Sequence, residues 1–183
     1  LLVAVILSAQ CTDIRVNQVT EKLFENHSTP AAMLELTQEE LEKYIFSCGL
    51  YKTKAEHILS ASRDILERFE GNVPDNIKDL MSLAGVGRKT ANVVYSVAFG
   101  GDAIAVDTHV FRVSNRLGIT DAKNVLDTEK QLMAAIPPEE WADSHHYILL
   151  HGRYVCKAQH PCCDKCSVRD MCKYYAEHNK VTR

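Results

Sequence analysis

The chain has 183 residues, of which 46% are hydrophobic, and its formal net charge is -3 at pH 7. This composition excludes a disordered protein and suffices for one large or two small domains with hydrophobic cores. The apolar start LLVAVIL is interrupted at Ser8, Gln10 and Asp13, well short of the roughly 20 residues that cross a bilayer, and no basic segment precedes it as in a signal peptide. Apolar and polar residues do not alternate in strand-like runs, so the pattern predicts an all-α fold.

The small net charge hides an uneven distribution. Residues 1–80 carry 8 Lys and Arg against 13 Asp and Glu, whereas residues 150–183 carry seven against three. Residues 81–118 have four basic residues against two acidic ones. The basic segments coincide with the two motifs described below, but an excess of this size is also typical of a solvated surface of mixed sign.

Turn and capping residues divide the chain into short helices. Thr12 or Asp13 is placed to cap the second of them, and Thr37 with Glu40 forms a capping box. The glycine at position 100 and the one after it mark the expected domain boundary. The apolar first residues resemble the middle of a helix. After them, the pattern predicts helices over residues 12–25, 30–36, 37–48, 52–69, 75–82, 88–98, 108–117, 124–136 and 138–155.

Residues 83–94 read LAGVGRKTANVV, a short turn between two helices, which is a helix-hairpin-helix. Gly85 and Gly87 permit positive φ or close backbone approach, and they leave no side chain between the backbone amides and a ligand. The amides at the start of the second helix predict an anion site that suits a phosphodiester better than a free nucleotide, since no GK[ST] follows and no strand precedes. A purely structural helix turn is the alternative. The second helix is expected to bury Ala91, Val94, Val97 and Ala98.

Two charged residues lie at expected helix starts. Lys89 faces the positive end of a helix dipole, which disfavours the ammonium form, so that in a cleft some neutral amine is available as a nucleophile. The alternative is a lysine that contacts phosphate or solvent. An Asp at the position of Asp107 ordinarily serves as a helix N-cap. The preceding segment from Ile104 to Val106 is apolar, however, which suggests that it runs through the interior and places the carboxylate at the wall of a cleft, where it can stabilise a developing cation. An amine and a carboxylate on a phosphate-binding scaffold suit cleavage at the anomeric carbon of a sugar.

Five of the seven cysteines fall within residues 156–172, which does not resemble a secreted disulfide framework. Four of them fit a C-x6-C-x2-C-x5-C spacing: Cys156, Cys163, Cys166 and Cys172. Thiolates this close repel one another unless a metal neutralises them, and both zinc and a [4Fe-4S] cluster take four thiolates. Cys162 offers a second register, C-x5-C-x3-C, which spacing alone leaves open.

Several motifs in order resemble the bacterial endonuclease III family of the helix-hairpin-helix glycosylase superfamily: ILSAQCTD at 6–13, GLYKTKA at 49–55, GVGRKTANVV at 85–94, AVDTHVFRV at 105–113 and HHYILLHGRYVC at 145–156. The resemblance covers essentially the whole chain and includes the cysteine spacing. It implies a two-domain fold: a helical barrel domain, residues 1–101, with the hairpin at about 75–98, and an iron-sulfur cluster domain, residues 102–183. In the family an N-terminal helix, which this chain lacks at its start, completes the cluster domain.

The resemblance implies a bifunctional DNA glycosylase and abasic-site lyase that removes oxidised pyrimidines from duplex DNA in base excision repair. Lys89 matches the lysine that attacks C1′ and forms the Schiff base for β-elimination, and Asp107 matches the aspartate that assists base departure. Gln10 matches a residue that fills the space of the flipped base, and Leu50 a wedge in the duplex. Further implied DNA-binding residues are Gly85, Val86, Gly87, Arg88 and Thr90; implied pocket residues are Ser8, Asp13 and His109; implied [4Fe-4S] ligands are Cys156, Cys163, Cys166 and Cys172.

We therefore expect damaged double-stranded DNA as partner, no membrane association, a monomer, and a place in the bacterial cytoplasm near the nucleoid. Two alternative functions remain at this point. One is the related adenine glycosylase family, which typically lacks the lysine at the position of Lys89 and carries a further domain; the other is a noncatalytic DNA-binding module with a structural metal. The chain departs from the family at Ala84, where proline is common, which would loosen the turn slightly. Cys162 is a second departure, an additional thiol beside an implied ligand.

Overall fold

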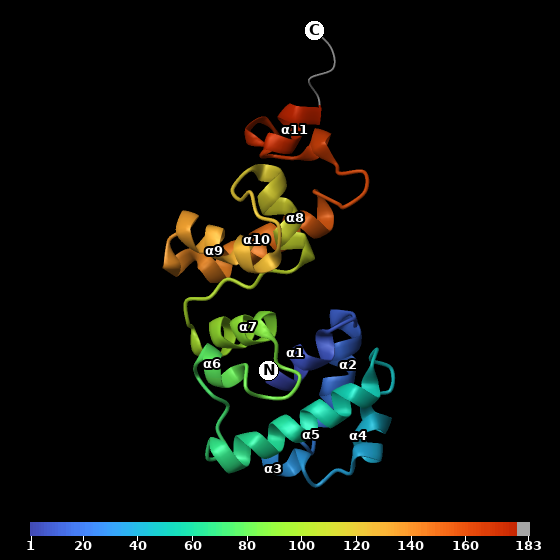
Figure 1. Ribbon diagram of the computed structural model, residues 1–183. Coiled ribbons are helices and arrows are strands. Elements are labelled where there is room, and N and C mark those ends of the chain that lie inside the picture. Colours follow the sequence, from blue (N-terminus) through green and yellow to red (C-terminus); the bar gives the residue numbers. More distant parts are fainter. Residues whose placement is uncertain (179–183) are drawn as a thin grey trace. The chain divides into compact units, whose positions relative to one another are not determined.

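A computed structural model describes residues 1–178, and all regular secondary structure in that range is helical (Figure 1), which confirms the all-α prediction. The chain forms two compact units, Leu1–Phe99 and Gly100–Arg183. Within the described range, no helix combines the length and the apolar character that a membrane span requires.

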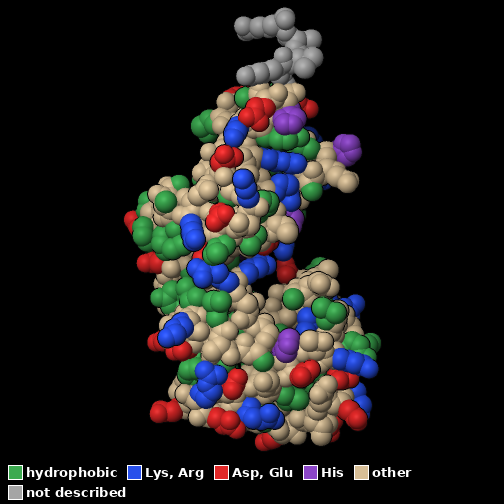
Figure 2. Space-filling view, viewed as in Figure 1, with side chains coloured by type: hydrophobic (Ala, Val, Ile, Leu, Met, Phe, Trp, Pro, Cys, Tyr) green, Lys and Arg blue, Asp and Glu red, His purple; other side chains and the backbone are tan. Residues whose placement is uncertain are grey.

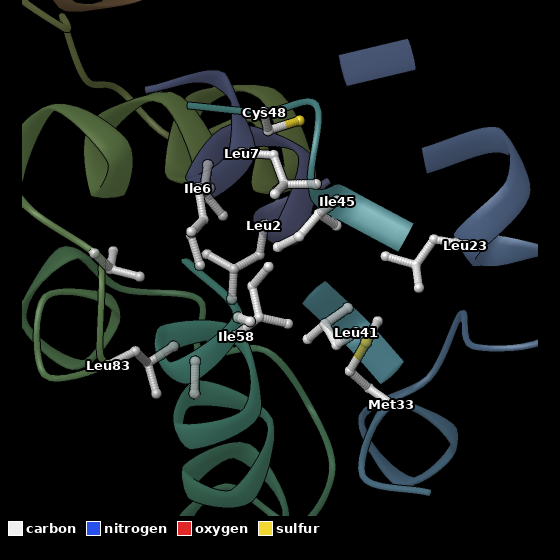
Figure 3. Close-up of a cluster of buried hydrophobic side chains, with 14 of the residues drawn as sticks. Leu2, Ile6, Leu7, Leu23, Met33, Leu41, Ile45, Cys48, Ile58 and Leu83 are labelled. Carbon is white, nitrogen blue, oxygen red and sulfur yellow. The ribbon is translucent and has the colours of Figure 1, made fainter. Parts of the chain in front are cut away.

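The first unit is built around a long helix, α5. Buried side chains from α1, α4 and α5, among them Leu7, Leu41, Ile45 and Ile58, form its core (Figure 3). Helices α1, α3 and α4 each pack against α5, and α1 also packs against α7. The helices are α1 (Leu2–Ser8), α2 (Asp13–Phe24), α3 (Pro30–Met33), α4 (Gln38–Ile45), α5 (Tyr51–Arg68), α6 (Ile77–Leu80) and α7 (Arg88–Phe99).

Local capping signals set several of these boundaries. Thr12 Oγ1 accepts a hydrogen bond from Arg15 N at 3.3 Å and starts α2. The predicted capping box at the start of α4 is complete, because Thr37 Oγ1 accepts from Glu40 N at 3.3 Å while Glu40 Oε2 accepts from Thr37 N at 2.8 Å. This last bond is the main reason that the pKa of Glu40 is lowered.

Two expectations for the hairpin helices were wrong. The predicted helix over 75–82 is the single turn α6, and its start is set by Asn76, whose Oδ1 accepts from Asp79 N at 2.9 Å. In α7, Ala91 and Val94 are buried as predicted, but Val97 is 54% exposed and Ala98 is exposed as well. The buried positions of α7 all lie in its first two turns, so the last turn extends beyond the residues that pack in the core.

The second unit is organised around α8, which packs against α9, α10 and α11. Its core contains Ile104, Val106, Val110, Val113 and Leu132, so the segment before α8 is buried as the sequence predicts. The helix expected over 138–155 is instead a 3₁₀ turn followed by an α-helix. The elements are α8 (Thr108–Leu117), α9 (Val125–Ala135), η1 (Pro138–Glu140), α10 (Trp141–Tyr154), η2 (Cys163–Lys165), η3 (Arg169–Met171) and α11 (Lys173–His178).

Candidate active site and metal centre

The turn between α6 and α7 is anchored by two buried apolar side chains. Leu83 is 3% exposed and Val86 is 6% exposed, and Val86 N donates a hydrogen bond to Leu83 O at 3.2 Å. Gly87 O then accepts from Ala91 N at 2.9 Å, which begins α7. The backbone of the turn is thus held from inside the core, and the amides of the first turn of α7 lie at its outer end.

The two glycines of this turn have different structural roles. Gly85 has a φ of +74°, and a Cβ added there would lie 2.9 Å from both Cβ and Nδ1 of His57. Gly85 is therefore required by the fold itself. At Gly87 an added Cβ would meet no atom within 4 Å. The absent side chain at Gly87 leaves open the surface beside the helix start, which a ligand backbone can approach.

The residues that follow Gly87 place two positive charges at this surface. Arg88 and Lys89 are the first two residues of α7 and both are exposed, while Thr90 is partly buried. Unpaired amides and a positive dipole end at a helix N-terminus favour anions, and Arg and Lys add to that preference. The arrangement can bind a phosphate group and presents an accessible primary amine beside it.

Two further turns of the first unit carry residues in the left-handed backbone region. Gln10 has a φ of 52° and Leu50 a φ of 59°; both are exposed, Leu50 by 59%. Such values are uncommon for residues other than glycine, so the surrounding structure must hold them. A Cβ added at Gly49 would lie 3.0 Å from Gln10 O, which shows that the two turns touch. Ser8 Oγ, by contrast, donates to Val5 O at 2.7 Å within α1, and Asp13 is exposed at the start of α2.

Sequence reasoning missed Lys54, a buried lysine that fixes one of these turns. Its side chain is 4% exposed, and its Nζ donates to Leu7 O at 2.8 Å and to Ala9 O at 2.6 Å. Burial lowers the pKa of Lys54. The sequence held a signal, because Lys54 occupies the buried stripe of α5 four residues before Ile58 and eight before Ser62.

In the second unit, Asp107 is the N-cap of α8. Its Oδ1 accepts from both His109 N and Val110 N at 2.8 Å. The Nη2 of Arg112 lies 3.2 Å from His109 Nδ1 and also donates to Gly152 O at 2.9 Å. Asp107 and His109 are thus held at the start of a helix that Arg112 ties to α10.

The cysteines of residues 156–172 all line one small cavity, of about 20 Å³. Burial raises the pKa of the Cys163 thiol, and the neighbouring negative charges of Cys156, Cys166 and Cys172 raise it further. The four thiols of the C-x6-C-x2-C-x5-C spacing therefore lie close enough to repel one another as thiolates, which is the condition that a bound cation relieves. Cys162 also lines this cavity.

Arg116, which the sequence reasoning also missed, holds the ends of the cysteine loop. Its Nη1 lies 3.5 Å from Cys156 Sγ and donates to Lys157 O at 2.7 Å, while Cys172 Sγ lies 3.2 Å from Arg116 O. Its guanidinium stacks on Tyr174, 4.6 Å from the ring centroid. The i, i+4 spacing of Arg112 and Arg116 on α8 was the available signal. Lys and Arg side chains are also prominent on the visible face of this unit in Figure 2.

The chemistry of the cysteine side chains fits a thiolate-bound metal centre. Among residues 1–178, no group of three or more His, Cys, Asp or Glu side chains is arranged to hold a metal ion. The five cysteines of residues 156–172 line one cavity, and cysteine thiolates are ligands for both zinc and iron-sulfur clusters.

Comparisons with known proteins identify the family. Residues 3–138 match the model of the HhH-GPD superfamily base excision DNA repair protein. The chain is 51% identical to endonuclease III of Haemophilus influenzae over 95% of its own length and 82% of the relative's. It is also 51% identical to endonuclease III of Bacillus subtilis, over 98% of its own length and 83% of the relative's.

Solved structures that resemble this chain support the same family. A trapped endonuclease III-DNA covalent intermediate, in an estranged-adenine complex, matches with a TM-score of 0.91 and 51% identity over 96% of this chain and 83% of that one. A thermostable thymine-DNA glycosylase matches with a TM-score of 0.89 and 27% identity, over 96% of this chain and 83% of that chain. The chain belongs to the HhH-GPD superfamily of base excision DNA repair proteins and, within it, to the endonuclease III family of DNA glycosylases and abasic-site lyases.

Proposed function

We propose that this enzyme removes oxidised pyrimidines from damaged double-stranded DNA, with Lys89 as the nucleophile and Asp107 as the group that assists base departure. The observation that carries the proposal is the position of Lys89: an accessible amine in the first turn of α7, two residues after the open backbone at Gly87. A nucleophile fixed beside a phosphate site attacks a sugar of the same strand at close range.

In the proposed reaction, the neutral amine of Lys89 attacks C1′, and the C1′–N bond to the base breaks with its electron pair leaving on the base, which takes up a proton. Asp107 stabilises the positive charge that develops on the sugar. The attached nitrogen then loses a proton, the C1′–O4′ bond breaks with its electron pair going to O4′, which takes up a proton, and a protonated imine forms between Lys89 and C1′. Loss of a proton from C2′ then expels the 3′ phosphate by β-elimination, and water releases the lysine.

We assign DNA contacts to the hairpin and to the two left-handed turns. Gly85, Val86, Gly87, Arg88 and Thr90 hold a backbone phosphate through the helix start. Gln10 and Leu50 enter the duplex, a role supported by their exposure and by the contact between their turns. A damaged, weakly paired base costs less to flip than a normal one. Ser8, Asp13 and His109 are assigned to the pocket; because Ser8 Oγ donates its proton to Val5 O, it is available to a base as a hydrogen-bond acceptor.

Cys156, Cys163, Cys166 and Cys172 would hold a [4Fe-4S] cluster, as the resemblance to the family implies. Bound by these residues, a cluster would offset part of the thiolate charge with its positively charged core, while Arg116 anchors the loop to α8. The proposal includes a monomeric protein in the bacterial cytoplasm, which sedimentation and fractionation would test.

Borohydride trapping tests the nucleophile. Borohydride reduces an imine to a stable amine, so wild-type protein incubated with an abasic-site or thymine-glycol duplex is expected to give an irreversible protein–DNA adduct. Lys89→Gln is expected to give none. Lys78→Gln is the matched control, because Lys78 is also an exposed lysine, in α6 of the same hairpin. An adduct that survives Lys89→Gln, or none with wild type, refutes the assignment. A noncatalytic DNA-binding module would bind the duplex without any adduct.

The visible spectrum tests the metal centre. Freshly isolated protein is expected to be coloured by iron-sulfur absorbance, whereas zinc is colourless. Cys166→Ala is expected to abolish the absorbance and the bound iron, and Cys162→Ala to retain both. Colour lost in Cys162→Ala and kept in Cys163→Ala would establish the alternative register.

A further inference from the structure

Two cysteines of the first unit flank the contact between the Gln10 turn and the Leu50 turn. Cys11 directly follows Gln10 and is partly buried against the core, whereas Cys48 directly precedes Gly49 and is 1% exposed. In Figure 3, Cys48 lies near Leu7 at one end of the core cluster. Neither thiol has a role in the glycosylase chemistry proposed above.

The backbones on either side bring these thiols together. The approach of 3.0 Å between Gln10 O and a Cβ position on Gly49 joins the residue before Cys11 to the residue after Cys48. The two thiols also act on each other: burial, the hydrogen bond with Cys11 and the neighbouring negative charge of Cys11 together raise the pKa of Cys48 to about 11. The two thiols therefore lie close together in this fold.

A buried cation lies beside the pair. Lys54 Nζ, held by Leu7 O at 2.8 Å and Ala9 O at 2.6 Å, interacts with the charges of both Cys11 and Cys48. The Lys54 ammonium lowers the pKa of Cys48 and so offsets part of the increase that burial causes. The thiolate is the form that attacks a disulfide. Cys11 is the more accessible of the two sulfurs, so it is the one that an external oxidant reaches first.

We propose that Cys11 and Cys48 are a redox-sensitive dithiol that forms a reversible disulfide with a low-molecular-weight disulfide as oxidant. The Cys11 thiolate attacks one sulfur of the oxidant and expels its other half as a thiolate, which leaves a mixed disulfide on Cys11. The Cys48 thiolate then attacks Cys11 Sγ and expels the second thiolate. In balance, the protein dithiol loses two protons and two electrons, and one oxidant disulfide becomes two thiols. The product joins the Gln10 turn covalently to the Leu50 turn.

The site does not depend on the proposed glycosylase activity, and its test is chemical. Full-length protein with its cluster intact, as followed by visible absorbance, is treated with oxidised glutathione, alkylated and digested with trypsin without reduction. Trypsin releases Cys11 in residues 1–15 and Cys48 in residues 44–52, each as the only cysteine of its peptide. The expected product is these two peptides joined by a disulfide, with a loss of two titratable thiols per chain that dithiothreitol restores.

Matched variants complete the test. Cys11→Ala and Cys48→Ala are each expected to abolish the joined peptide, and Cys162→Ala to retain it. If Cys48→Ala fails to fold by circular dichroism, Cys11→Ala alone decides, because Cys11 is only partly buried. A Cys11 peptide that carries glutathione without joining residues 44–52, or that joins another cysteine, overturns the proposal. So does a Cys11 that remains unmodified while other thiols oxidise.

Discussion

Alanine at Gly85 and alanine at Gly87 are expected to have opposite effects on stability, although the positions are two residues apart. At Gly85, alanine would adopt a φ of +74°, which costs about 1–2 kcal/mol for a residue with a Cβ. Its Cβ would also lie 2.9 Å from His57 Cβ, and such overpacking costs about 1–3 kcal/mol more. Together these terms predict that Gly85→Ala lowers the free energy of unfolding by about 2–5 kcal/mol.

Gly87→Ala is the matched change. An added Cβ has no neighbour within 4 Å, so the substitution mainly restricts the unfolded chain. That effect leaves the free energy of unfolding unchanged or raises it by up to about 1 kcal/mol. The same Cβ would nevertheless stand at the helix start proposed to hold a phosphate. Loss of one such hydrogen bond, worth about 1–2 kcal/mol, would weaken DNA binding about tenfold.

Urea unfolding followed by circular dichroism measures the stability difference, and fluorescence anisotropy with an abasic-analogue duplex measures binding. If Gly87→Ala destabilises the protein as much as Gly85→Ala, the steric reasoning about the turn is wrong. If Gly87→Ala folds normally and binds DNA as tightly as wild type, the amides beside Gly87 do not hold a phosphate.

Three further outcomes are expected. Asp107→Asn should change the free energy of unfolding by less than about 1 kcal/mol, because asparagine also caps helices, while base release from a thymine-glycol duplex falls at least about 100-fold; equal activity would refute the role of Asp107. Thr37→Ala should cost about 0.5–2 kcal/mol in urea unfolding, since it removes the acceptor for Glu40 N; no change would mean that the capping box contributes nothing. The pKa of Cys48 is about 11 in the fold against a usual 9.0, so the contribution of its thiol to stability is present below pH 9 and is lost as pH rises through 11. The difference in free energy of unfolding between wild type and Cys48→Ala should therefore fall by about 2–3 kcal/mol across that window, as measured by denaturation at stepped pH.

The features that could be predicted from the sequence are those set by neighbours along the chain. The Thr37 capping box, the Asp107 cap and the turn at Gly85 each depend on residues within four positions, and the structure has all three. The burial of Val97 was predicted wrongly because helical periodicity gives the direction of a face but not how far along the helix its packing partners extend.

The contacts that could not be predicted join distant parts of the chain. Lys54 bonds to carbonyls 45 and 47 residues away, and Arg112 and Arg116 bond to carbonyls 40 to 44 residues away. In the sequence Lys54 falls on the buried stripe of α5, and Arg112 and Arg116 lie one turn apart on α8, but neither pattern identifies the carbonyl groups that these side chains bond to. Only a fold that brings carbonyl groups to them makes burial of the charge tolerable.

The arrangement along α8 gives a physical reason for the basic excess in an acidic chain. Asp107 caps the start of this helix, Arg112 bonds to the carbonyls of Gly152 and Cys156 in its middle, and Arg116 contacts Cys156 Sγ near its end. Four thiolates in one loop carry negative charge, so the arginines of α8 that contact the loop offset the repulsion between the thiolates. Because the same helix positions Asp107, any change that loosens the cysteine loop from Arg116 acts on the support of the proposed catalytic carboxylate as well. Arg112 and Arg116 are therefore accounted for by the segments they hold, before any contribution they make to DNA binding.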